Sequence, residues 1–290
     1  MGIGNVAETK LTARLRSAAE ALGDKNLVTS ELLIWLHMIH HAAAGREQGD
    51  GGQGHDSNEP GFFAPYLLSL GDVSPSPLSW PPDLREAFGG TNLLSLLDAE
   101  GSLEKQITFL QQAREQWAST RPPSCEEEGW LPESIFNLKN LVWARGHYLA
   151  RRYPGRFATG ESQLEGREAL DGREVGLQQL GSMVPLLDCL NHNPAEEWLS
   201  FVVTPDILKV VCNYPVAKGK EIFANYGQQS SERLLYAYGF ALEDNDHDAV
   251  ALRLMGKQQG VQGEKYLGTY YIQEGDLNGV PPVSDEQKKG

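Results

Sequence analysis

The chain lacks long apolar runs and closely spaced cysteines. No stretch approaches the roughly 18 apolar residues that a membrane-spanning helix needs, and the start, MGIGNVAETK, has no apolar segment of the secretion-signal type. The three cysteines, Cys125, Cys189 and Cys212, are odd in number and lie far apart. We therefore expect a soluble intracellular protein of the cytoplasm or nucleus, with no membrane contact and no disulfide framework.

Basic charge is also scarce. The chain has 25 Lys and Arg against 39 Asp and Glu, a net charge of -14, and the basic residues do not gather with aromatic ones. A direct nucleic-acid partner is therefore not expected. The acidity fits either general solubility or a basic protein substrate, and the composition does not indicate an oligomeric state.

The first half of the chain is predicted to be helical. Thr29 and the apolar spacing of TSELLIWLHMIHHAAA predict a helix over residues 29–44, followed by a Gly-rich polar loop over 45–61. Further helical stretches are expected over 93–119 and 134–152, the second ending near Pro154.

The second half changes to short strands. The β-branched and aromatic runs LSFVV, ILKVVCNY and IFANYG are divided by turn signals and predict a small antiparallel sheet. A short helix, SSERLLYAYG, is expected to end at Gly239 in a left-handed cap. The last fifty residues show no strong pattern, and their tail is expected to be disordered. The predicted fold class is α+β.

Polar residues interrupt the apolar run PLLDCLNHNP, which spans residues 185–194. Asp188, Asn191 and His192 can bond the backbone where a strand ends. Asp188, Cys189 and His192 can also be read as an incomplete metal site, and Cys189 as a nucleophile without its usual elbow motif. These residues alone leave the three interpretations open.

Two histidines in the first half of the chain raise the question of a metal site again. His37 and His41 have the i, i+4 spacing of metal ligands on a helix, but no partner carboxylate or HExxH pattern accompanies them. We predict no metal site.

A second motif follows some thirty residues later. The combination of DCLNH with NYG and SERLLYAYGF resembles the C-terminal part of the SET domain, in the branch of the Rubisco large-subunit methyltransferase. Upstream, GFFAPYLLSL, PPDLREAFGGTNL and WARGHYLARRY are similar to three further segments of that family. The resemblance covers roughly residues 28 to 255.

The resemblance implies a fold of short curved β-sheets, with a pseudoknot of the NH and YG segments and a large helical insert. It divides the chain into four parts: an atypical N-terminal segment (1–27), the helical insert (28–180), a C-terminal SET segment (181–255) and a partial or disordered end (256–290). Only Gly2-Ile3-Gly4 stands in for the family's Gly-x-Gly strand, so the chain is expected to be truncated relative to the family at both ends.

The resemblance also implies a function, methyl transfer from S-adenosylmethionine to a lysine side chain of a protein substrate. It assigns five residues to cofactor binding: Arg151, Asp188, Asn191, His192 and Tyr226. Tyr226 is in addition the catalytic residue beside the transferred methyl group, while Asp188 braces the knot and Asn191 holds the cofactor.

The substrate side of the site is assigned to two aromatic residues, Tyr153 and Tyr238. An aromatic wall suits the alkyl stem and cationic head of lysine. A histidine-methylating relative has Asn in place of the aromatic residue at position 153, so a protein-histidine methyltransferase stays an alternative. The missing Gly-x-Gly strand favours a second alternative, a catalytically inactive SET-like module that binds protein.

Overall fold

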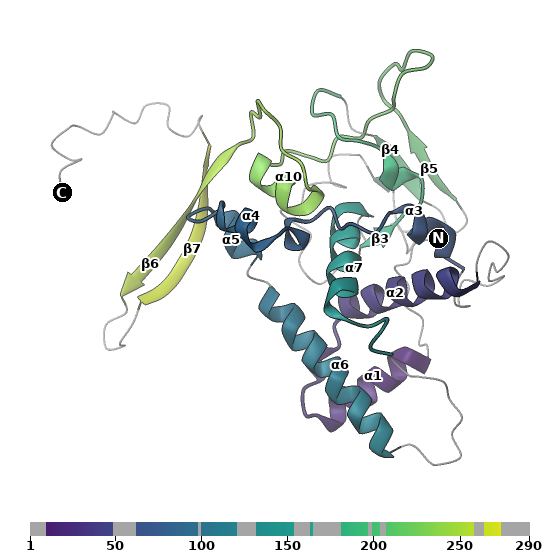
Figure 1. Ribbon diagram of the computed structural model, residues 1–290. Coiled ribbons are helices and arrows are strands. Elements are labelled where there is room, and N and C mark those ends of the chain that lie inside the picture. Colours follow the sequence, from purple (N-terminus) through teal and green to yellow (C-terminus); the bar gives the residue numbers. More distant parts are fainter. Residues whose placement is uncertain are drawn as a thin grey trace.

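The computed structural model describes residues 10–48, 62–97, 100–120, 132–153, 163–164, 181–196, 199–203, 207–257 and 264–273. Helices form its first half, and its second half combines short strands, a long hairpin and the helix α10 (Figure 1). The helices of the first half are α1 (Lys10–Ala21), η1 (Lys25–Leu27), α2 (Ser30–Gln48), α3 (Ala64–Ser69), η3 (Pro77–Ser79), α4 (Pro82–Glu86), α5 (Asn92–Leu97), α6 (Glu100–Thr120) and α7 (Leu138–Arg151).

The second half contains β1 (Arg152–Tyr153), β2 (Gln163–Leu164), β3 (Ser182–Met183), η4 (Leu187–Cys189), β4 (Ser200–Val203), β5 (Leu208–Val211), α10 (Ser231–Tyr238), β6 (Ala249–Lys257) and β7 (Glu264–Gln273). This mixture of helices and small antiparallel sheets is the predicted α+β class.

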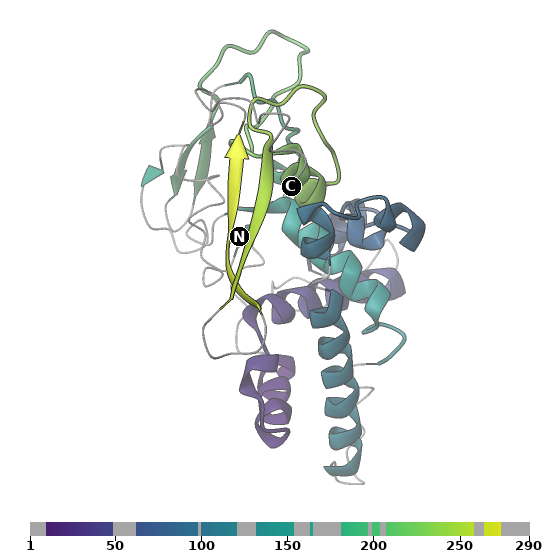
Figure 2. The same ribbon diagram turned by 90° about the vertical axis from the view of Figure 1, so that its left-hand side faces the viewer.

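Helix α2 lies at the centre of the main hydrophobic core. Leu32, Ile34, Leu36 and Met38 are each fully buried, so successive turns bury side chains on more than one face of the helix. Such a helix needs neighbours on several sides. Helices α3 and α7 pack against α2, and α1 packs against α6, as Figures 1 and 2 show from two directions.

The prediction of a loop from residue 45 is wrong for its first four residues, because α2 continues to Gln48. A Cβ atom on Gly45 would lie 2.3 Å from the Cβ of Ala64 in α3. Glycine at this position therefore allows two helices to approach closely and does not end the helix. The rest of the predicted loop lies outside the described residues.

Helix α7 confirms the predicted helix before Pro154 but begins at Leu138, later than residue 134. The cap decides this, since the Asn137 side chain accepts a hydrogen bond of 3.0 Å from the backbone amide of Asn140. The indole of Trp143 then donates to the carbonyl of Gly71 at 2.7 Å, which fixes α7 to the segment after α3.

Two of the three predicted strands pair as expected. Strands β4 and β5 are antiparallel, and β2 pairs with the other edge of β4. The third predicted strand, IFANYG, does not join this sheet among the described residues. It forms instead a parallel bridge between Ala224 and His192. This bridge lies in the pseudoknot of the NH and YG segments that the resemblance implies, so Ala224 pairs with the distant NH segment and not with the neighbouring sheet.

The predicted helix before Gly239 is confirmed. Helix α10 (Ser231–Tyr238) has Ser230 as its N-cap, whose side chain accepts a hydrogen bond from the amide of Arg233, and Gly239, with φ 82°, as its C-cap. After it, the expectation of a patternless segment is wrong, because β6 and β7 form a long antiparallel hairpin. Val250, Leu252 and Tyr270 stay largely exposed, so these apolar side chains of the hairpin do not pack into the described core. Residues 274–290 lie outside the described part.

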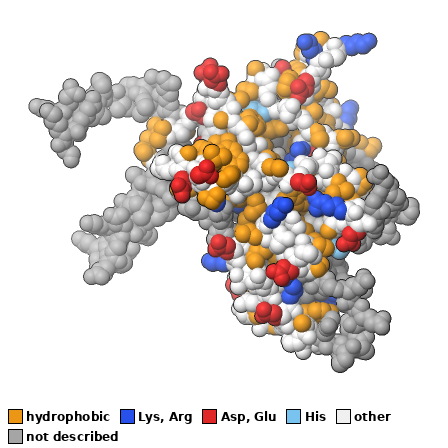
Figure 3. All heavy atoms as spheres, in the orientation of Figure 1, with side chains coloured by type: hydrophobic (Ala, Val, Ile, Leu, Met, Phe, Trp, Pro, Cys, Tyr) orange, Lys and Arg blue, Asp and Glu red, His pale blue; other side chains and the backbone are white. Residues whose placement is uncertain are grey.

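The surface agrees with the acidic composition. On the face drawn in Figure 3, the Lys and Arg side chains of the described residues are scattered among acidic and apolar ones. Among the described helices, none combines the length and the apolar character that crossing a membrane requires.

We predict that Gly239→Ala destabilises the protein far more than Gly219→Ala. Both glycines have φ near 80°, but a Cβ on Gly239 would lie 2.2 Å from the Pro75 carbonyl oxygen, and a Cβ on Gly219 would meet nothing within 4 Å. Gly219→Ala should cost about 1 kcal/mol, and Gly239→Ala at least about 2 kcal/mol more, because the chain must move apart. Urea denaturation measures both, and equal losses would contradict the expectation.

We also predict acid sensitivity to which two histidines of α2 contribute, beside His147 of α7, whose pKa burial also lowers to about 4. Burial lowers the pKa of His37 to about 4, with His40 adding a like charge, and burial lowers that of His41 to about 4, with His37 and His40 adding to the effect. Between pH 6.5 and 4 the unfolded chain binds more protons than the folded one, so the free energy of unfolding falls as the pH falls. At pH 5 the loss should be on the order of 1 kcal/mol per histidine after allowance for solvent screening.

Denaturation at pH 7.5, 6 and 5 measures this dependence. His41→Phe should flatten it, because the phenyl ring keeps the edge-to-face contact with Phe63, whose centroid is 5.3 Å away. Leu84→Ala is the control, because Leu84 lies in α4, is 51% exposed and carries no titrating group; it should leave the slope unchanged. An unchanged slope in His41→Phe would refute the assignment.

Candidate functional site

The NH and YG segments lie side by side. The Ala224 amide donates to the carbonyl of Asn191 at 2.8 Å, and the Asn193 amide donates to the carbonyl of Ala224 at 3.1 Å. The amide of Tyr226 then donates to Nδ1 of His192 at 3.0 Å. These bonds bring together two motifs that are about thirty residues apart, in the parallel pairing that the predicted pseudoknot requires.

His192 serves this pairing through its ring. Because Nδ1 accepts a hydrogen bond from a backbone amide, the ring proton of the neutral form is on Nε2. Burial lowers the pKa of His192, against a smaller opposing effect of the Ala224 carbonyl. The ring is therefore neutral at physiological pH.

A turn that begins at Leu186 and continues through η4 organises the rest of the site. Three of its backbone carbonyl groups accept hydrogen bonds from side chains. The Tyr153 hydroxyl donates to the Leu187 carbonyl at 3.2 Å, and Nη1 of Arg151 donates to the Asp188 carbonyl at 2.9 Å. The Tyr226 hydroxyl donates to the Leu190 carbonyl at 2.5 Å. Residues from α7, β1 and the YG segment thus meet at one short stretch of backbone.

The path of the chain explains why they meet. Helix α7 ends at Arg151, and β1 follows at once with Tyr153, paired with Ser182 of β3. The Tyr148 hydroxyl of α7 accepts from the Gly181 amide at 2.8 Å, which holds the start of β3 against the helix. Strand β3 then leads into the turn, so Arg151 and Tyr153 face the backbone that follows it.

Arg151 has hydrogen-bonding capacity to spare. Its Nη1 lies 4.0 Å from Oδ1 of Asp188, a contact at the limit of an ion pair. Its Nε is buried and has no hydrogen-bond partner among the described residues. A buried N–H without a partner costs free energy, and a guanidinium of this kind suits a carboxylate, which it can bind through two parallel hydrogen bonds.

Asp188 is held mainly from the helical part of the chain. Its carboxylate is buried and accepts a short hydrogen bond from the hydroxyl of Tyr66 in α3. Burial raises the pKa of Asp188, while the hydrogen bond from Tyr66 and the charge of Arg151 act in the opposite direction. Burial and the bond to Asp188 raise the pKa of Tyr66. The bracing predicted for Asp188 thus runs to α3, through a residue that the sequence interpretation did not single out.

Aromatic rings gather around Tyr226. The ring of His192 is stacked at 5.0 Å, that of Tyr238 lies at 4.6 Å and that of Phe240 at 6.4 Å. Burial and the neighbouring Tyr238 raise the pKa of Tyr226 to about 12. Burial also raises the pKa values of Tyr153 and Tyr238, so these phenols stay protonated at neutral pH. Phe240 was not predicted as a site residue, although it stands in the quoted YGF motif.

Asn191 departs from the group. Its backbone takes part in the pairing, but its side chain is exposed and donates to Oε1 of Glu221 at 2.7 Å. The sequence analysis did not single out Glu221, because a carboxylate shortly before the NYG motif is not by itself a recognisable pattern. Six of the seven predicted residues therefore lie together, joined by the turn at η4, the paired NH and YG segments and the aromatic rings around Tyr226. The side chain of the seventh, Asn191, points outward.

The competing metal interpretation finds no matching geometry. Among the described residues, no group of three or more His, Cys, Asp and Glu side chains is arranged to hold a metal ion. Asp188 bonds Tyr66, Cys189 is exposed, and His192 bonds the backbone of Tyr226.

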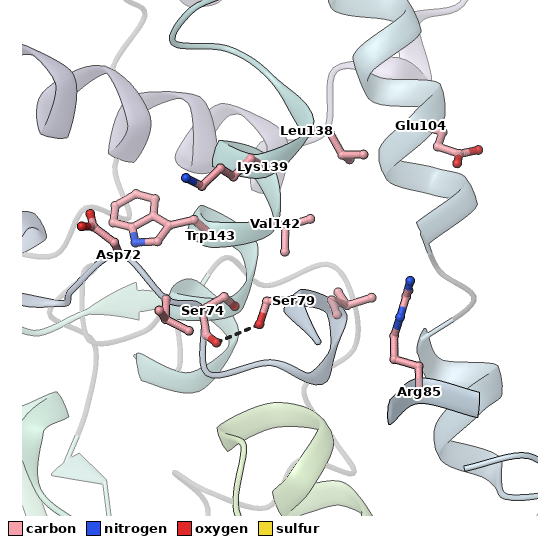
Figure 4. Close-up of a pocket in the computed structure, with 11 residues that line it drawn as sticks. Asp72, Ser74, Ser79, Arg85, Glu104, Leu138, Lys139, Val142 and Trp143 are labelled. Carbon is pink, nitrogen blue, oxygen red and sulfur yellow. Dashed lines mark hydrogen bonds between the residues drawn. The ribbon is translucent and has the colours of Figure 1, made fainter. Parts of the chain in front are cut away.

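A cavity of about 540 Å³ lies elsewhere, between η3, α4, α6 and α7 (Figure 4). Trp143 and Val142 line it from α7, with Lys139 and Arg85 at its edges. It shares no residue with the group around Tyr226. The cavity is thus separate from the site that the motifs predict.

Comparison with known proteins supports the family resemblance that the motifs indicate. No protein-family model matches the chain. It is 39% identical over 74 residues to the ribosomal lysine N-methyltransferase set10 of Schizosaccharomyces pombe, which is 25% of this chain and 14% of that enzyme. It is 36% identical over 86 residues to the N-lysine methyltransferase SETD6 of Bos taurus, 29% of this chain and 19% of that enzyme.

A solved structure extends the likeness to most of the chain. The crystal structure of the SET domain of LSMT bound to lysine and AdoHcy aligns with a TM-score of 0.57 and 17% identity, over 89% of this chain and 49% of that one. The fold is therefore the SET-type α+β fold. The chain resembles the SET-domain lysine methyltransferases of the Rubisco LSMT-like branch, and it spans about half the length of the LSMT chain and less of the two curated relatives.

We predict that Tyr66 and Asp188 are energetically coupled. Tyr66→Phe removes the hydroxyl that satisfies a buried carboxylate and should cost about 1–3 kcal/mol of unfolding free energy. In the double variant with Asp188→Asn, the losses should fall short of additivity by about 1 kcal/mol or more. Tyr214→Phe, which removes a hydroxyl bonded to the backbone of Phe223, is the control and should add independently to Asp188→Asn. Additivity in both pairs would argue against the coupling.

Proposed function

We propose that this chain carries the catalytic part of a SET-type protein-lysine methyltransferase that uses S-adenosylmethionine. The observation that carries the proposal is the meeting of Arg151, Tyr153 and Tyr226 on the carbonyl groups of one turn, beside the paired NH and YG segments. The lysine methyltransferases named above support it by their similarity to part of the chain.

We also propose the division of the chain that the resemblance implies. Residues 28–180 would be the helical insert, and residues 181–255 the C-terminal SET segment, with 1–27 and 256–290 as flanking parts. The hydrophobic clusters follow this division in part. Most of one cluster comes from helices within residues 28–180 and most of the second from residues 181–255, while Leu15, Met183 and Tyr153 pack across the proposed boundaries. The intracellular location remains a prediction from the cysteines.

The cofactor side of the proposed site fits the residues present. The Nε of Arg151 has no hydrogen-bond partner among the described residues, while Nη1 donates to the Asp188 carbonyl. The guanidinium can therefore bind a carboxylate through its Nε edge. The NH segment supplies backbone polar groups, and the Asn191 side chain would have to leave Glu221 to reach the cofactor. Asp188 links Arg151 to α3, because its carbonyl accepts from Arg151 and its carboxylate accepts from Tyr66. When bound, S-adenosylmethionine would supply an electrophilic methyl group on a sulfonium.

The lysine side of the proposed site is aromatic. Tyr153, Tyr226 and Tyr238 would enclose the alkyl stem of the acceptor and keep water from it. Their raised pKa values keep the hydroxyl groups neutral, and a poorly solvated pocket favours the uncharged amine of lysine, whose reference pKa is about 10.4. The Tyr226 hydroxyl donates its proton to the Leu190 carbonyl, which leaves its lone pairs to orient the acceptor and methyl group through weak C–H···O contacts. Alignment of the reacting groups is the main contribution of these residues.

Transfer of a labelled methyl group to a protein extract tests the proposal. Tyr226→Phe should lower the transfer rate at least about tenfold, because the oriented hydroxyl is lost at the reacting centre. Tyr214→Phe is the matched control, since that hydroxyl bonds the backbone of Phe223 and has no part in the proposed site, and its rate should stay near that of the wild type. Equal rates for Tyr226→Phe and wild type would refute the catalytic role.

Two further readouts separate the alternatives. Calorimetry with S-adenosylmethionine should show binding that Arg151→Ala weakens. Mass spectrometry of the labelled product should locate the methyl group on lysine, and a methylated histidine would support the alternative acceptor. Neither binding nor transfer by the wild type would favour a protein-binding module without catalytic activity.

A further inference from the structure

Leu186 has an unusual backbone. With φ 74° and ψ -44°, it is the only residue other than glycine with positive φ in the described part of the chain. These angles are close to those of a classic γ-turn, a rare and strained conformation for a residue with a side chain. All other positive-φ positions given for the described residues are glycines.

The side chain of Leu186 does not explain the strain. Its relative exposure is 84%, the highest among the exposed large hydrophobic side chains, so packing within the protein compensates little. Glycine would adopt the same backbone at lower cost. The leucine side chain is therefore accessible to a molecule outside the described part of the chain.

The position of Leu186 at the start of the turn indicates what its side chain contacts. The residue begins the turn whose carbonyl groups hold Tyr153, Arg151 and Tyr226, and it is itself bonded, through its carbonyl, to the amide of Cys189 at 3.3 Å. Asp188, two residues on, is buried, while Leu186 faces solvent. A strained, outward apolar side chain thus stands at the edge of the proposed lysine site.

We propose that Leu186 is a specificity-determining residue, which contacts an apolar side chain of the protein substrate close to the target lysine. This inference rests on the proposed methyltransferase function. A leucine offers only apolar contact, so the partner residue is apolar, and its position follows from the short chain distance between Leu186 and the turn that anchors the site. Burial of one such side chain is enough to change binding about tenfold or more.

The test compares two leucine truncations. Leu186→Ala should raise at least about tenfold the concentration of extract protein that gives half-maximal labelling. The maximal rate, the affinity for S-adenosylmethionine and the transfer to free lysine should stay near those of the wild type. Leu84→Ala is the matched control, because Leu84 lies in α4, is 51% exposed and has no part in the site. It should leave every value unchanged.

Leu186→Gly separates side chain from backbone. It relieves the positive φ, so its thermal stability should equal or exceed that of the wild type, yet it should show the same loss with extract protein as Leu186→Ala. Half-maximal labelling unchanged in both variants would overturn the inference and leave the proposed function intact. An equal loss with free lysine would also overturn it, because the turn itself would then be damaged. No transfer by the wild type to either acceptor would overturn the proposed function, and the inference with it.

Discussion

The parallel pairing of the NH segment with the YG segment is the constraint on which the rest of the site depends. It joins Asn191, Asn193 and Ala224 through backbone hydrogen bonds, and His192 extends it through its ring. This pairing holds Tyr226 next to the turn at η4. With it, the hydroxyl of Tyr226 reaches the Leu190 carbonyl, and the ring cluster of Tyr238 and Phe240 closes around it.

The helical part of the chain supports this pairing from one side. Helix α7 delivers Arg151, and α3 delivers Tyr66, whose hydroxyl bonds the buried carboxylate of Asp188. Both helices pack on α2 or on its neighbours, so the core of the helical part determines where these two side chains can lie. A change in the packing of α3 against α2, where Gly45 faces Ala64, would be transmitted to Asp188 through Tyr66.

Local signals predicted the elements that depend on local chemistry. The helix before Gly239 was predicted from its serine cap and its glycine, and α2 from the spacing of its leucines, because these signals act within a few residues. The end of α2 was mispredicted because Gly45 serves a contact with a helix that comes later in the chain. The hairpin of β6 and β7 was missed, although Val250, Leu252 and Leu254 alternate with smaller or charged residues in the sequence.

The sequence by itself determined the class of fold and the two motifs, since DCLNH and NYGQQSSERLLYAYGF are readable without coordinates and resemble one family. Only the tertiary structure decided how the predicted residues are held. The partners of Arg151, Tyr153 and Tyr226 are backbone carbonyl groups, and every residue type carries the same carbonyl. No residue letter could therefore reveal them, nor the strained backbone of Leu186, which depends on where β3 and the NH segment must lie.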